Sequence, residues 1–523
     1  MSPFPQEIVD HIVSFLPHIP RTKVFESSSE RKARKFFPRC AAVSRQFQLA
    51  IEPRTFITLA ITNDKYELQK FRAIVDSRRF SYIREISYSV ALPRGKQVIY
   101  WAFEQLDEQA VNNKTFTIAM KHLFQVLKPQ AKSGKGMILR INYIDSPSDT
   151  FLQNSLSYRR HQRSRIRLVM KPEDLPLLPC VSRLVLSPTI HLLQPRMLID
   201  IASRLPELTA IELTFDAREF IYLGLPVSDR KSLANAIVKH FKALKKVREV
   251  RLLMDADGGP INQLINLPPC CSTLGYDPLG SALRRWSRGL EFLNLQGSFD
   301  QTLFWPDIQE AEWHRYQLEL KHCTLKYLYV KLERYTPSGW WYFMPTSSSD
   351  YGNPAEDDDL DLFPPLNAPS MDQQLINVEL WWGSDPTYIP RDQKYLRTDP
   401  HDETIEPLIE SWAKVLRWMP ALEVAALSFA DQNTGENEQT PYGDDNWMIF
   451  YRAPHAENCQ WDSKLSDAAK KSRCLWFRNV GDWMPRSSTI QLLLDAGKRG
   501  HEDTPIVVLR DDEIITDTFR EQA

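Results

Sequence analysis

Several features that would assign a function directly are absent from this sequence of 523 residues. Its 65 Lys and Arg residues almost balance its 66 Asp and Glu residues, so the net charge of −1 creates no overall attraction to nucleic acid. No apolar run approaches the length of about 20 residues that a membrane-spanning helix needs. No Gly-rich turn joins a strand to a helix, as it does in nucleotide-binding α/β folds. We therefore expect a protein that contacts neither nucleic acid nor a membrane.

Cysteine is scarce and its pattern is irregular. The seven cysteines are odd in number and scattered, so they form no disulfide framework and suit a reducing compartment. The first residues also lack the basic segment followed by an apolar segment that marks secreted proteins. We therefore expect a cytoplasmic or nuclear location, or both.

Signatures of catalysis and metal binding are missing as well. The sequence contains no Gly-Lys-Ser/Thr phosphate loop, no Gly-x-Ser-x-Gly turn and no His-Glu-x-x-His helix. His314, His322 and Cys323 lie near one another, but no second pair of ligands has the spacing of a zinc site. The acidic run at 357–361 and the basic cluster at 159–167 are interpreted as exposed charged segments. We expect no catalytic residue, no metal and no cofactor, and hence no enzyme.

The body of the chain repeats the pattern apolar-x-x-apolar-x-apolar. Its last three positions alternate as in a short strand. The copies are Ile83-Ile86-Tyr88, Ile138-Ile141-Tyr143, Val181-Leu184-Leu186, Leu208-Ile211-Leu213, Val247-Val250-Leu252, Leu290-Leu293-Leu295, Leu325-Leu328-Val330, Leu375-Val378-Leu380 and Leu422-Ala425-Leu427. Helical faces precede several copies, for example at 198–205, 233–244 and 408–419. Pro206 and Pro420 follow two of these helices and start the turn into the strand.

Helix, turn and short parallel strand in repetition is similar to the leucine-rich-repeat solenoids. The steps between middle residues are irregular, from 27 residues (Leu184 to Ile211) to 55 residues (Ile86 to Ile141), and the Asn or Cys that usually follows the strand is missing. We predict an α/β fold, specifically an irregular leucine-rich-repeat-like α/β solenoid with parallel strands. The alternative is a compact α/β domain built from ordinary βα units.

The first 56 residues predict two short amphipathic helices. The apolar face of the first consists of Ile8, Ile12, Phe15 and Leu16. That of the second consists of Val43, Phe47, Ala50 and Ile51. Pro5 suits the first turn of a helix, where its missing N–H costs nothing. Because so small a piece cannot bury a core of its own, we expect it to need a partner surface.

These two segments resemble the F-box. The family pattern is Leu-Pro-x-Glu-Ile, then spaced aliphatic residues, then Val-Ser-(Arg/Lys)-x-Phe/Trp, ending in Pro and Leu-Phe. This sequence reads Phe4-Pro5-Gln6-Glu7-Ile8, Ile12, Leu16-Pro17, Val43-Ser44-Arg45-Gln46-Phe47, Pro53 and Thr55-Phe56. Phe4 departs from the usual Leu, and residues 18–36 stretch the middle of the motif. Large fungal families of F-box-like proteins are similar, whereas the alternative interpretation is an ordinary N-terminal helical cap.

The resemblance implies a non-catalytic substrate receptor of an SCF-type (Skp-cullin-F-box) ubiquitin ligase. The N-terminal helices would bind a Skp-type adaptor and through it a cullin, and the repeat domain would hold an unidentified target protein for ubiquitin-dependent degradation. Adaptor contacts, or the small core behind them, would come from Phe4, Pro5, Ile8, Ile12, Leu16, Val43 and Phe47. The alternative is a protein–protein interaction scaffold outside any ligase, in which the F-box has decayed.

The motifs divide the chain into three segments. These are an F-box-like helical motif at 1–56, irregular repeats with inserted loops at 57–430 and a C-terminal cap region at 431–523. The cap region contains a strand-like run at 505–509.

Two aromatic pairs are candidates for target recognition, Trp340-Trp341 and Trp381-Trp382. Trp is enriched at binding hot spots and is also a common core residue. We expect one member of each pair to lie in the core, and we take Trp341 and Trp382 as candidate target contacts.

Overall fold

The structure is a computed structural model of the 523-residue chain. It describes residues 5–14, 39–93, 104–130, 136–145, 164–186, 193–216, 225–255, 276–308, 310, 315–345, 397–429, 447–456, 465–502, 504–511 and 513–522. The chain divides into two compact units, residues 1–214 with 242–247 and residues 215–241 with 248–523. The N-terminal helices therefore share a unit with the first strands. The boundaries at residues 56 and 430 are based on sequence motifs and stay a prediction.

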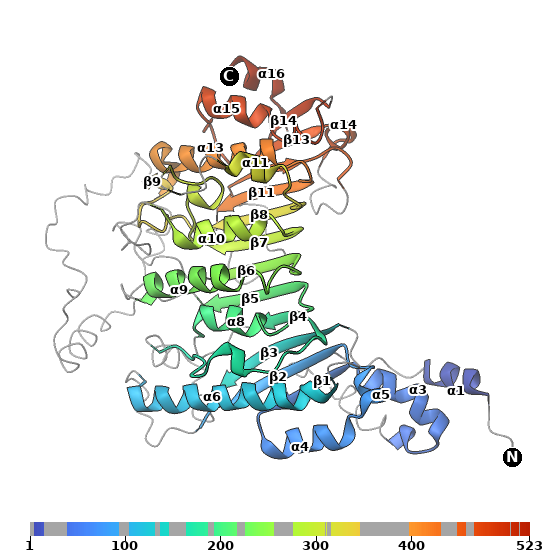
Figure 1. Ribbon diagram of the computed structural model, residues 1–523. Helices are drawn as coiled ribbons and strands as arrows, with labels where there is room; N and C mark the ends of the chain where they lie inside the picture. The colour runs from blue at the N-terminus through green and yellow to red at the C-terminus, as the bar shows by residue number, and fades with distance from the viewer. Residues whose placement is uncertain are drawn as a thin grey trace. The chain divides into compact units, whose positions relative to one another are not determined.

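The first unit contains a parallel sheet. Its strands, in spatial order, are β1 (Thr58–Thr62), β2 (Glu85–Ala91), β3 (Met137–Asp145), β4 (Val181–Leu186) and β5 (Ala210–Asp216). The connecting helices are α4 (Lys65–Ile74), α5 (Ser77–Phe80), α6 (Leu106–Leu127) and α8 (Pro195–Ala202), with short 3₁₀ turns η1 (Lys128–Gln130) and η3 (Pro172–Asp174). Figure 1 shows α6 and α8 lying along one face of these strands.

Alternation of side chains along each strand explains why the helices cover that face. In β2, Ile86, Tyr88 and Val90 are buried, while the intervening residues are half-buried. The Tyr88 hydroxyl donates a hydrogen bond of 3.0 Å to the carbonyl of Ala119 in α6. Each fully buried aliphatic side chain contributes about 1.5–3 kcal/mol, so the helical layer is held mainly by apolar burial.

The second unit contains a mixed sheet. Its strands, in spatial order, are β6 (Glu249–Asp255), β7 (Phe292–Gly297), β8 (Tyr327–Leu332), β11 (Val424–Phe429), β12 (Met448–Arg452), β13 (Arg473–Arg478), β14 (Ile506–Arg510) and β15 (Glu513–Ile514). Pairing from β6 to β11 is parallel, β12 is antiparallel to both of its neighbours, β13 and β14 are parallel, and β15 is antiparallel.

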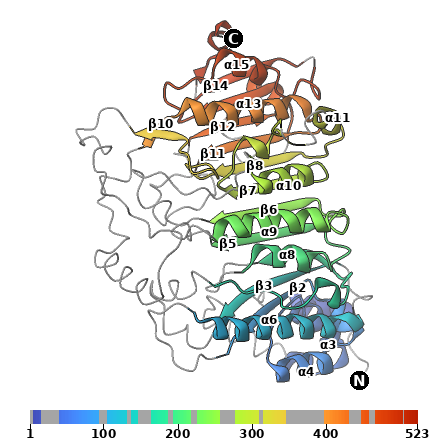
Figure 2. The ribbon, with the colours of Figure 1, turned by 60° about the vertical axis from the view of Figure 1, so that its left-hand side comes forward.

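Helices and a small strand pair complete the second unit. The helices are α9 (Leu225–His240), α10 (Pro278–Ser287), α11 (Tyr316–Leu320), α13 (Asp402–Trp418), α14 (Asp467–Lys471), α15 (Ser487–Leu494) and α16 (Thr516–Glu521), with the 3₁₀ turn η4 (Gln301–Leu303). Strands β9 (Phe343–Pro345) and β10 (Arg397–Pro400) pair antiparallel. Figure 2 shows α9, α10 and α13 along one side of the strands.

The predicted α/β class is confirmed, and so is the presence of a strand at each copy that the structure describes. Eight of the nine copies end in a strand, from β2 to β8 and in β11, whereas Leu375-Val378-Leu380 lies outside the described residues. The middle residues of neighbouring copies pair directly in the register, as in Leu184 with Ile211, Val250 with Leu293, Leu293 with Leu328, and Leu328 with Ala425. The same apolar position therefore recurs from strand to strand and forms one continuous buried row in each unit.

Two details of the strand prediction are wrong. In β3 the side chains of Met137, Leu139 and Ile141 are buried, and Ile138 is only half-buried. Leu139 pairs with Ile86 on one side and with Leu184 on the other, so the middle position of this copy is Leu139, two residues before the predicted Ile141, which is buried on the same face. Strand β1 was not predicted, because its five residues bury only Ile61 and carry little apolar signal.

The C-terminal region continues the sheet of the second unit. The strand-like run at 505–509 is confirmed as β14. The other face of this part of the sheet is covered by a second core, which contains Phe450, Trp476 and Leu465. None of the helices in the described ranges is long and apolar enough to cross a bilayer.

Candidate functional site

The two N-terminal helices form as the sequence predicts. They are α1 (Gln6–Ser14) and α3 (Arg45–Thr55). The Ser44 hydroxyl caps α3 by accepting a hydrogen bond of 3.2 Å from the backbone N–H of Phe47. This gives the Val-Ser-Arg-x-Phe segment a physical role, because its serine satisfies an N–H group at the start of the helix.

A small core joins the two helices. Val9 and Val13 of α1 and Ile51 of α3 are each at most 1% exposed, and Phe47 packs against them with part of its surface. Arg54 also donates a hydrogen bond to the carbonyl of Val13. The helix pair is therefore held by this small core and by the hydrogen bond from Arg54. Other apolar side chains of the pair stay uncovered.

The uncovered side chains include key residues of the F-box-like motif. Exposed fractions are 45% for Ile8, 46% for Ile12, 71% for Val43 and 38% for Leu49. Ile8 and Ile12 therefore lie outside the small core, and the side of α1 that packs on α3 consists of Val9 and Val13, which the predicted apolar face did not include. Helix α1, the turn before α3 and α3 itself thus expose four large apolar side chains to solvent.

The remaining predicted adaptor contacts have different surroundings. Pro5 is exposed, and Phe47 is half-buried against the small core. Val43 lies in the turn before α3 and not within the helix. Phe4 and Leu16, like Phe15, lie outside the described residues.

A buried carboxylate attaches α3 to the rest of the first unit. Glu52 is 3% exposed and forms ion pairs of 2.6 Å with Arg78 and 2.7 Å with Arg79, both from α5. Burial alone would raise the pKa of Glu52, but hydrogen bonds from Arg79 and Gln48 and the charges of both arginines outweigh it, so the pKa is lowered. No sequence pattern predicts this contact, because residues 52 and 78–79 meet only through the tertiary fold.

Of the two candidate target contacts, the structure describes only Trp341, and it corrects that prediction. Trp341 is 3% exposed and packs edge-on against Tyr335, with ring centroids 6.1 Å apart, so it is a core residue. Its neighbour Trp340 is 59% exposed and is the member of the pair that faces solvent. Trp382 lies outside the described residues.

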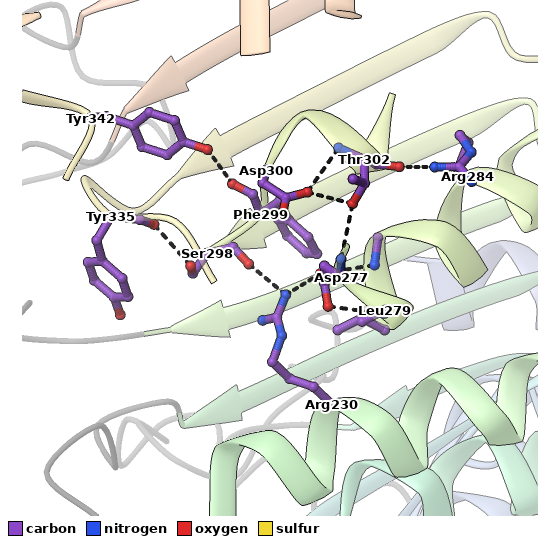
Figure 3. Close-up of polar contacts among 11 residues, drawn as sticks. Arg230, Asp277, Leu279, Arg284, Ser298, Phe299, Asp300, Thr302, Tyr335 and Tyr342 are labelled. Carbon is purple, nitrogen blue, oxygen red and sulfur yellow. Dashed lines mark hydrogen bonds and ion pairs between the residues drawn. The ribbon is translucent and has the colours of Figure 1, made fainter. Parts of the chain in front are cut away.

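A buried polar network lies in the second unit at the end of β7 (Figure 3). Arg230 of α9 donates to the Asp277 carboxylate at 2.5 Å and to the Ser298 carbonyl at 2.9 Å. Asp300 accepts hydrogen bonds from the backbone N–H and the hydroxyl of Thr302, at 2.9 and 2.5 Å. Burial, together with the nearby Asp277 charge, raises the pKa of Asp300 to about 6. The sequence did not predict this network.

Other residues considered from the sequence do not assemble into a site. No group of three or more potential metal ligands is found among the described residues. Cys323 is buried, and burial raises the pKa of its thiol to about 11, so it stays protonated at neutral pH. His314 and residues 357–361 lie outside the described chain, as do residues 159–163 of the basic cluster.

Comparisons of the sequence with models of known protein families and with curated proteins find no match.

Proposed function

We propose that this protein is the substrate-recognition subunit of an SCF-type ubiquitin ligase. In this proposal the N-terminal helices bind a Skp-type adaptor, the adaptor links the chain to a cullin, and the strand-rich body holds a target protein. Other subunits transfer ubiquitin. The chain's contribution is positional, because it raises the effective concentration of the target near the transfer machinery.

The observation that carries the proposal is the exposure of apolar residues at the F-box-like positions. Ile8, Ile12 and Val43 match the motif and are all among the exposed large apolar side chains. Truncation of a central apolar contact in an interface typically costs about 2 kcal/mol or more. The order and spacing of the Pro5, Ile8 and Ser44 positions add independent support from the sequence.

The target-binding body is proposed to be an irregular leucine-rich-repeat-like solenoid. Support comes from the direct register of the repeated apolar positions and from the helices that cover one face in each unit. Such a scaffold would display loops and one sheet face to a partner. Trp340 is an exposed aromatic residue available for such a contact in the second unit.

Co-purification with a recombinant fungal Skp-type adaptor tests the proposal. We expect the double variant Ile8→Ala with Ile12→Ala to lose the adaptor while keeping the circular dichroism spectrum of the wild type. The matched control is Asp10→Ala with Ser14→Ala, which changes two exposed residues outside the motif with the same spacing on the same helix. Full adaptor binding by the Ile8/Ile12 variant would contradict the proposal.

Two departures from the motif favour the second candidate, an interaction scaffold outside any ligase. Phe4 replaces the usual Leu, and residues 18–36 interrupt the pattern. If the folded wild-type chain fails to bind the adaptor but captures other proteins through its body, this second function is the better one.

A further inference from the structure

An open pocket of about 550 Å³ lies near the C-terminus of the second unit. Its walls come from the start of β13, from α15, from the segment that leads into β14 and from α16, whose positions are shown in Figure 1. The lining combines two arginines, Arg473 and Arg520, with the apolar residues Leu494, Pro505 and Ile506.

Arg473 is the deepest charged group of the pocket, with only 6% of its surface exposed. Its Nε donates to the Thr504 carbonyl at 2.9 Å, and its Nη1 donates to the carbonyls of Leu494 and Ala496 at 3.3 and 2.6 Å. These acceptors are neutral. No Asp or Glu among the described residues forms an ion pair with this guanidinium, although burial lowers the pKa of Arg473 and the charge of Asp495, itself paired with Arg417 and Lys498, acts against that lowering.

The Nη2 atom of Arg473 differs from Nε and Nη1, which both have carbonyl acceptors. A guanidinium carries two N–H groups on each terminal nitrogen, and no acceptor for those of Nη2 is found in the described part of the chain. Solvent reaches this atom, because it is not among the fully buried polar atoms that lack a partner. A side chain that is more than nine-tenths buried thus lines the pocket and keeps one terminal nitrogen without an acceptor in the described part of the chain.

Neighbouring groups add positive potential. Arg520 lines the pocket, and its ion pair with Asp517 is long at 3.9 Å and exposed, so it is weak. Burial lowers the pKa of His501, and the charges of Arg473 and His455 lower it further. Among the described residues that line the pocket, Glu502 is the one carboxylate, beside the two arginines.

We propose that this pocket binds a small anionic ligand, either a carboxylate or a phosphate monoester, through Arg473 and Arg520. The anionic group accepts hydrogen bonds from Nη2 of Arg473 and from the Arg520 guanidinium, which are strong when both partners are charged. The apolar part of the ligand lies against Leu494, Pro505 and Ile506. This site does not depend on the docking of an adaptor at the N-terminal helices.

Isothermal titration calorimetry of the full chain with three matched probes tests the site. Benzoate and phenyl phosphate share a ring and differ in the anionic group, while benzyl alcohol is the neutral control. At constant ionic strength, we expect saturable binding of benzoate or phenyl phosphate and none of benzyl alcohol. The anion that binds identifies the ligand class.

Substitutions in the pocket should change this affinity in opposite directions. Arg520→Gln should weaken binding about tenfold, because it removes a charge-assisted hydrogen bond. Glu502→Gln should tighten binding several-fold by removing like-charge repulsion, a gain that misfolding cannot produce. Lys498→Gln removes an exposed positive charge in the turn after α15 that does not line the pocket, and it should leave the affinity unchanged.

Three outcomes would overturn the proposal. They are the absence of saturable heat with both anions, equal binding of benzyl alcohol, and unchanged affinity in both Arg520→Gln and Glu502→Gln. Arg473→Lys is less decisive because the guanidinium also holds three backbone carbonyls, so it is used only if the variant unfolds at the wild-type temperature.

Discussion

Helices α1 and α13 are both amphipathic, but only one of them is covered by the chain itself. In α13 the large apolar residues Ile405, Leu408, Ile409, Trp412, Val415 and Leu416 are at most 1% exposed. In α1 only Val9 and Val13 are buried, while Ile8 and Ile12 keep nearly half of their surface in solvent. An apolar side chain left in water forgoes the 1.5–3 kcal/mol that full burial provides. Helix α13 is therefore fully covered by its own chain, whereas α1 keeps apolar surface exposed to solvent.

A buried carboxylate in each unit has a shifted pKa, and the two shifts have opposite directions. Glu52 beside the N-terminal helices has two arginine partners, and its pKa is lowered. In the second unit, Asp300 lies near another carboxylate, Asp277, and its pKa is raised to about 6. The N-terminal helices are thus attached through a carboxylate with two arginine partners, and they expose apolar side chains. In the second unit the apolar side chains of α13 are buried, and the buried Asp300 has a raised pKa.

The largest expected effect is the loss of Trp412 from α13. Trp412→Ala should destabilise the second unit by about 3–5 kcal/mol, because a fully buried indole leaves a cavity. Urea unfolding followed by circular dichroism measures this change. Trp412→Phe is the control and should cost less, since the Trp412 indole N–H is buried without a hydrogen-bond partner. Equal stability of Trp412→Ala and the wild type would show that α13 is not sealed.

The second effect concerns Asp300 and depends on pH. An acid whose pKa is higher in the folded state holds its proton more tightly there, so its contribution to stability declines as pH rises from about 4 to about 6. Asp300→Asn keeps an acceptor for Thr302 and should remove this decline, which makes the variant more stable at neutral pH by on the order of 2 kcal/mol. Urea unfolding at about pH 5 and about pH 7.5 gives the comparison. A parallel decline in both proteins would contradict the assignment.

A smaller effect is expected for the buried side of α1. Val13→Ala removes two methyl groups from the small core with Ile51 and should cost about 1.5 kcal/mol. Hydrogen exchange of the α1 amides is a suitable measurement because the change is local. Faster exchange in α1 with unchanged exchange in α13 is the expected result. Unchanged exchange in α1 would mean that Val13 does not hold the helix pair together.

The smallest effect on stability is expected for the open side of α1. Ile12→Ala should change the free energy of unfolding by less than about 0.5 kcal/mol, because Ile12 is 46% exposed. Comparison with Val13→Ala in the same assay separates the two sides of one helix. A loss as large as that of Val13→Ala would show that another part of the chain covers Ile12.

The strands were predictable because their signal is local. Apolar alternation marks a buried strand face, and the register then aligns Leu293 with both Val250 and Leu328. The orientation of α1 was not predictable, because residues 8, 9, 12 and 13 are all apolar and only the position of α3 decides which side is buried. The same limit applies to Trp341, whose burial depends on packing against Tyr335, and to Arg473, whose partners are carbonyls far along the chain.

Hydrogen–deuterium exchange of the full chain, alone and with a saturating Skp-type adaptor, tests the central claim most directly. If the N-terminal helices have an apolar side that a partner completes, the amides of α1 and α3 will exchange more slowly in the complex, while those of α13 will not change. Identical exchange of α1 and α3 with and without the adaptor would contradict the account.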